Sequence, residues 1–118
     1  YLQKNLAGNI DIFNGKIAMT PEGNVDIKGT LTTEKLAIDS SDKNTASAGK
    51  VTIKAGEKYV EIETIALNEN SLILTTPKTP IAVGTEKVSD NIFRINLENT
   101  ADRDIDIDWL IVDLQAQK

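Results

Sequence analysis

A short phrase near the start of the chain repeats at an offset of fifteen residues. Gly-Asn-Ile-Asp-Ile at 8–12 returns as Gly-Asn-Val-Asp-Ile at 23–27. Each copy joins a turn-forming dipeptide to an apolar-polar-apolar triplet, the pattern of a short strand that begins at a turn. Recurrence of such a unit at a fixed offset is typical of stacked β-units, and about three units are needed for a stable array. The phrase therefore predicts the end of a longer β-stalk, built as a β-solenoid or triple β-helix.

The remaining sequence also follows the two-residue alternation of β-strands. No segment keeps a helical period over three turns, and turn signals such as Asn14-Gly15 separate the apolar runs. A stretch of small and polar residues at 41–49 has the composition of a linker. We therefore predict an all-β chain, with a short repetitive β-stalk at 1–40, a linker at 41–49 and a small antiparallel β-sandwich at 50–118.

Alternation within the second region predicts which side chains form its core. In the segment 91–97, Phe93, Ile95 and Leu97 fall on one face of a strand. The same reasoning over the whole region gives a core of thirteen residues: Val51, Ile53, Val60, Ile62, Leu72, Leu74, Phe93, Ile95, Leu97, Ile105, Ile107, Trp109 and Ile111.

Composition excludes several classes of site. The chain of 118 residues has a net charge of −5 and no basic block, which argues against binding to nucleic acid or an anionic membrane. It contains no cysteine and no histidine, so thiolate metal sites, disulfides and histidine-based triads are excluded. No apolar run approaches the ~18 residues of a membrane span. We expect no cofactor, no metal and no membrane insertion.

Five phrases occur in an order that resembles the small β-sandwich modules at the ends of bacterial and phage fibre proteins. The phrases are Val51–Glu57, Val60–Ile62, Ser71–Pro77, Asn91–Ile95 and Asp106–Val112. The segment 23–36 is similar to the phrase that leads into head domains in tail-fibre-like stalks. This resemblance, which spans residues 23–114, implies an elongated β-stalk with a distal head, usually trimeric. H-type-lectin-like members bind sugars. Their closing strand often has two aromatic residues, whereas here Trp109 is followed by Leu110.

Four aspartates form the most conspicuous polar pattern. Asp102, Asp104, Asp106 and Asp108 alternate with other residues, so in a strand they lie on one face about 6.8 Å apart. That spacing is too wide for neighbours to share one calcium ion at ~2.3–2.6 Å. We interpret the row as a solvated outer face that also prevents pairing between strand edges. A calcium site would need further oxygens from other strands or chains.

Other candidates for chemistry are weaker. Pairs among Glu57, Glu61, Glu63 and Glu69 would need a glycosidase cleft, for which the sequence gives no sign. Serines 40, 41, 47 and 71 lie near Lys43, Lys50 and Lys54, but in linker composition or at a strand start. Trp109 alternates with isoleucines and is expected in the core, which leaves Tyr59 as the exposed aromatic.

The closing strand changes character along its length. Asp104, Asp106 and Asp108 are followed on the same face by Leu110, Val112 and Leu114, while the opposite face stays apolar. A strand that is apolar on both faces is typical of burial between two layers. We therefore predict a subunit contact at Leu110, Val112 and Leu114.

These patterns favour a non-enzymatic structural or adhesive head of a homotrimeric fibre on a virion or cell surface, outside the cell. Its partners would be copies of itself and a surface glycan, with no nucleic acid. Two alternatives are a carbohydrate-binding receptor-recognition domain and an accessory module of an enzyme.

Overall fold

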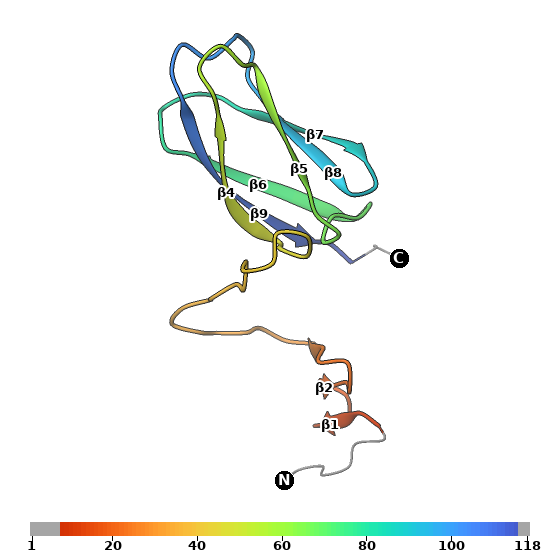
Figure 1. Cartoon of the computed structure of the whole chain (residues 1–118). Coiled ribbons are helices and arrows are strands. Elements are labelled where there is room, and N and C mark those ends of the chain that lie inside the picture. Colours follow the sequence, from red (N-terminus) through yellow and green to blue (C-terminus); the bar gives the residue numbers. More distant parts are fainter. Residues whose placement is uncertain (1–7, 116–118) are drawn as a thin grey trace. The chain divides into compact units, whose positions relative to one another are not determined.

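The computed structural model describes residues 8–115, which contain nine β-strands and no helix (Figure 1). The strands form three antiparallel sheets of three strands each. This confirms the all-β prediction. The chain divides between Leu36 and Ala37 into two compact units, called here the N-terminal unit and the C-terminal unit.

The N-terminal unit is a three-stranded meander. It consists of β1 (Ile10–Ile12), β2 (Ile17–Met19) and β3 (Val25–Ile27), in the order β1-β2-β3. The first turn forms where Asn14-Gly15 predicts it. Phe13, Asn14 and Gly15 all have positive φ, and the Gly15 N–H donates to Asp11 Oδ1 at 2.5 Å. The two copies of the repeat are β1 and β3, which run on either side of β2 and do not pair with each other.

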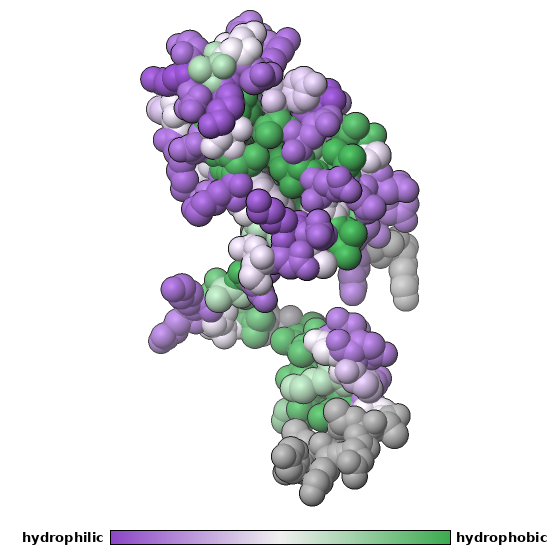
Figure 2. Space-filling model, viewed as in Figure 1, coloured by the Kyte–Doolittle hydropathy of each residue, from purple (hydrophilic) through white to green (hydrophobic). Residues whose placement is uncertain are grey.

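One face of this small sheet is apolar at every position. Its side chains form two rows across the strands, one made of Ile10, Met19 and Val25 and one made of Ile12, Ile17 and Ile27. The opposite face carries Asp11, Ala18 and Asp26. Hydrophobic residues gather over part of this unit in Figure 2. None of residues 8–36 is buried, so the described part of the N-terminal unit has no core of its own.

The C-terminal unit consists of two sheets. One has the order β4-β9-β6, built from β4 (Ala48–Ile53), β9 (Ile105–Asp113) and β6 (Ser71–Pro77). The other has the order β5-β8-β7, built from β5 (Tyr59–Glu63), β8 (Ile92–Asn96) and β7 (Gly84–Ser89). The inner faces of the sheets meet where Phe93 of β8 contacts Trp109 of β9 edge to face, with ring centroids 5.3 Å apart.

The core agrees with the predicted inner faces except on β6. Ile53, Phe93, Ile95 and Leu97 are buried, as are Ile105, Ile107, Trp109 and Ile111 of β9, and Val51, Val60 and Ile62 pack against them. Leu72 and Leu74 were predicted in the core, but they are 44% and 51% exposed. β6 lies in the opposite phase because Ile73 pairs with the buried Ile111 and shares its inner face.

The segment before β4 is fixed to the C-terminal unit by Thr64. This threonine is buried, and its hydroxyl donates to the Ala46 carbonyl at 2.6 Å. The neighbouring Ile65 N–H donates to the Asn44 carbonyl at 2.9 Å. Ala46 is buried in the core cluster, and β4 begins at Ala48, within the segment 41–49 that the composition identified as a linker.

Candidate functional site

The outer face of the sheet β4-β9-β6 has a polar half. Here Asp102, Asp104 and Asp106 of the predicted row are exposed and Asp108 is half-buried, and each of three members has a donor on a neighbouring segment. Asp104 accepts from the Ala55 N–H at 2.9 Å and lies 3.7 Å from Lys54 Nζ. Asp106 accepts from the Thr52 hydroxyl at 2.7 Å. Asp102, in the preceding loop, is exposed and lies 3.9 Å from Arg103.

Asp108 lies between two lysines. Its carboxylate oxygens are 2.5 Å from Lys78 Nζ and 3.3 Å from Lys50 Nζ. The hydrogen bond from Lys78, followed by that from Lys50, holds the pKa of Asp108 below its ordinary value. Within the row, Asp104 and Asp108 are therefore paired with lysines and Asp106 with a threonine hydroxyl on neighbouring segments.

Calcium and chelator are expected to leave the stability of the protein unchanged. The aspartate oxygens already have lysine, threonine or backbone donors, and a cation beside Asp108 would meet two ammonium groups. Among residues 8–115 no group of three or more acidic side chains is placed to hold a metal ion. Melting curves with EDTA and with millimolar calcium test this expectation. A rise of more than a few degrees in calcium would show that the row binds the ion.

The other half of the same outer face is apolar. Leu110 pairs across the ladder with Ala48 on one side and Leu74 on the other, and Val112 pairs with Leu72. Leu114 follows β9 and is exposed. We call these six residues the apolar patch: Ala48, Leu72, Leu74, Leu110, Val112 and Leu114. The predicted contact residues Leu110, Val112 and Leu114 thus share a face with three residues that the sequence did not assign to it.

The apolar patch lies at one end of the sheet. It includes the first residue of β4 and the last residues of β9. The chain therefore enters β4 at this end of the sheet. Leu72 and Leu74 were missed because they flank Ile73 in an uninterrupted apolar run, in which alternation does not identify the inner side. Their register with β9 is the signal that assigns them to the patch.

A groove of about 740 Å³ opens along the edge where β4 and β5 face each other. Its walls include Gly49 and Val51 of β4 and Ile62 and Glu63 of β5, with Trp109 behind Gly49. Ser40, Lys43 and Lys50 also line it, together with Glu61, whose carboxylate is held by Arg94 at 2.7 Å. The groove thus brings together members of the serine–lysine set and of the glutamate set, which the sequence analysis treated as separate candidates.

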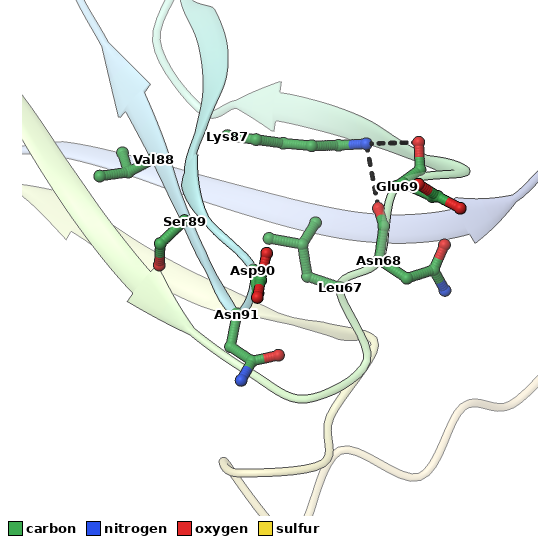
Figure 3. Close-up of a pocket in the computed structure, with 8 residues that line it drawn as sticks. All are labelled: Leu67, Asn68, Glu69, Lys87, Val88, Ser89, Asp90 and Asn91. Atoms are coloured by element: carbon green, nitrogen blue, oxygen red, sulfur yellow. Dashed lines mark hydrogen bonds between the residues drawn. The ribbon is translucent and has the colours of Figure 1, made fainter.

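A second hollow of about 540 Å³ lies between the β5–β6 loop and the β7–β8 turn (Figure 3). The side chain of Lys87 extends across it, and its ammonium group donates to the carbonyls of Asn68 and Glu69 at 3.0 and 3.1 Å. Because its cation ties β7 to the β5–β6 loop, this hollow is a structural junction.

The remaining candidates are dispersed. Glu57 lies in the β4–β5 turn and Glu69 beside the hollow of Figure 3, away from Glu61 and Glu63 of the groove. Ser71 donates to Asp113 at 2.6 Å, which lowers the pKa of that carboxyl, and Ser41 donates to Asp39. Within the described residues no serine is hydrogen-bonded to a lysine. Tyr59 is exposed, as predicted, and stacks under Arg94.

No family model, no curated protein and no solved structure matches the chain. Residues 8–115 contain no helix with the length and hydrophobicity of a membrane span. Function is therefore inferred from the surfaces described above.

Proposed function

We propose that this chain is a non-enzymatic structural or adhesive module of a homotrimeric fibre on a virion or cell surface. In this proposal the N-terminal unit is the end of a β-stalk and the C-terminal unit is a β-sandwich head. The observation that carries it is the apolar face of the sheet β1-β2-β3, on which Met19 and Val25 are exposed and the other residues only half-buried, in a unit that has no buried residue between positions 8 and 36.

A sheet of this kind needs a partner to be stable. Ordering each residue costs about 1–2 kcal/mol of backbone entropy, which is normally offset by burial of apolar surface. A small sheet needs a hydrophobic face packed against another element to be stable in water. Ile12, Ile17 and Ile27 provide the apolar side chains for such packing, but all three remain only half-buried within the described part of the unit.

Further copies of the same chain are the proposed cover. Most soluble oligomers are closed and symmetric, so one apolar face can be buried by its equivalents. Three copies about an axis would bury each narrow face against two neighbours and leave the ends of the unit free for more sheet along the axis, as a stalk requires. The apolar patch on the C-terminal unit supports the same arrangement, with Leu110, Val112 and Leu114 at a contact between heads.

Replacing Ile17 by aspartate is expected to dissociate the oligomer, because the change places an unpaired charge in the centre of the apolar face. The matched control is Ala18→Asp, one residue away on the opposite face, which already carries Asp11 and Asp26. Light scattering coupled to size exclusion reads out the mass of both variants. Equal masses for the two variants would contradict the proposed role of this face.

The second candidate function, a carbohydrate-binding receptor-recognition domain, is favoured by one observation. The groove between β4 and β5 combines apolar walls with unpaired polar groups, a mixture that suits a ligand with both apolar and hydroxyl surfaces.

A further inference from the structure

The groove between β4 and β5 contains a buried hydrogen-bond donor without an acceptor. Trp109 is 7% exposed, and its ring packs edge to face against Phe93. Among the described residues no oxygen accepts a hydrogen bond from its indole Nε1–H. A buried indole N–H usually has a partner. A donor that lines an open groove is available to a ligand.

Gly49 is the reason that this donor reaches the groove. Gly49 pairs directly with Trp109, and the indole lies across the space where a side chain would be. A Cβ at position 49 would be 2.9 Å from Cζ2 and 3.1 Å from Nε1 of Trp109. Glycine therefore places no side chain over the Nε1 edge of the ring, and both residues line the groove.

The other groups of the groove complete a site of mixed character. Val51 and Ile62 provide apolar walls, and both are partly buried. Glu63 and Lys43 line the groove, and neither side chain has an ion pair or hydrogen bond within residues 8–115. One free acceptor and one free cationic donor thus accompany the indole N–H.

We propose that this groove binds a neutral ring rich in hydroxyl groups, such as a saccharide. A hydroxyl group both accepts and donates, so neighbouring hydroxyls satisfy the indole N–H and the Glu63 carboxylate together. The C–H surface of such a ring packs on Val51 and Ile62. The groove is lined by carboxylates, which repel an anion, and by lysines, which repel a cation; the carboxylates belong to Glu61, Glu63 and Asp108, and the lysines are Lys43 and Lys50. Because neither sign of charge is favoured, a neutral ligand fits best. The site adds a ligand to the adhesive role proposed above but does not depend on association of chains.

The single tryptophan of the chain makes a direct test possible, because its indole N–H gives one NMR cross-peak. The probes are the methyl glycosides of glucose, galactose, mannose and N-acetylglucosamine, each titrated to about 50 mM, a range that detects millimolar affinity. With at least one probe the indole peak is expected to shift and saturate. No shift of this peak with any of the four would overturn the proposal.

Three variants separate the site from the fold. Trp109→Phe keeps an aromatic ring in the core but removes the N–H, and is expected to abolish binding as followed by backbone amide shifts of Val51 and Ile62. Glu63→Gln is expected to weaken binding about tenfold, because a hydrogen bond to a charged acceptor is replaced by a neutral one. Glu57→Gln, outside the groove, serves as the control. Unchanged affinity in both Trp109→Phe and Glu63→Gln would reject this site.

Ile17→Asp is expected to keep the affinity for the ligand, so loss of the oligomer and loss of ligand binding are measured separately.

Discussion

Replacement of Trp109 by alanine is expected to lower the free energy of unfolding by about 3–5 kcal/mol, the range for large aromatic residues removed from a core. Trp109 lies near the middle of β9, the central strand of its sheet, and is buried between the two sheets. It contacts Phe93 of the facing sheet at an interplanar angle of 72° and covers Gly49 on the neighbouring strand. Alanine would leave a cavity at the point where three strands meet.

Tyr59→Ala is the matched control for this prediction. Tyr59 is also aromatic and also in a strand, but it is 47% exposed and its ring contact is with the half-buried Arg94, 4.1 Å from the ring centroid. Its loss is expected to cost about 1 kcal/mol or less. Urea unfolding of both variants at neutral pH measures the difference. Comparable losses in the two would show that Trp109 does not anchor the core.

Val112→Asp is expected to dissociate the oligomer of the full chain into monomers. Val112 lies in the apolar patch beside Leu72 and two residues from Leu110. If the patch is a contact between heads, the new carboxylate is desolvated there without a partner, which costs about 3–5 kcal/mol for each copy. In a symmetric oligomer the same desolvation cost applies at every contact, so even a tight oligomer is expected to dissociate.

Val88→Asp is the control for this experiment. Val88 is a strand valine of similar exposure, 46% against 41% for Val112, but it lies on β7, in the other sheet and outside the apolar patch. Size exclusion with light scattering, together with far-UV circular dichroism, reports mass and fold. A folded Val112→Asp protein with the mass of the wild type would remove the apolar patch from the contact.

The strands with regular alternation could be predicted from the sequence. Phe93 and Ile95 are buried where alternation places them, and so are Ile105, Ile107 and Trp109. On β6 the rule failed because Leu72, Ile73 and Leu74 give no alternation, and polar Ser71 and Thr75 occupy the inner face beside Ile73. In that run only the pairing with β9 determines which residues face inward.

Contacts between distant segments could not be predicted. The aspartate row on the outer face was expected, but Lys50, Thr52 and Lys78 join it through strand register and not through spacing in the sequence. The same holds for the groove, because Gly49 belongs to a stretch of small residues and becomes notable only when β4 places it opposite Trp109. The N-terminal repeat predicted short strands, but a fixed offset does not distinguish stacked copies from two strands that flank a third.

The most direct test of the central proposal is the mass of the unmodified chain in solution. Sedimentation equilibrium at several micromolar concentrations measures it without a shape assumption. We expect three times the mass of one chain, because the half-exposed apolar face of the N-terminal sheet and the apolar patch would both be buried in a trimer. A folded protein that sediments as a monomer across this range would contradict the fibre proposal.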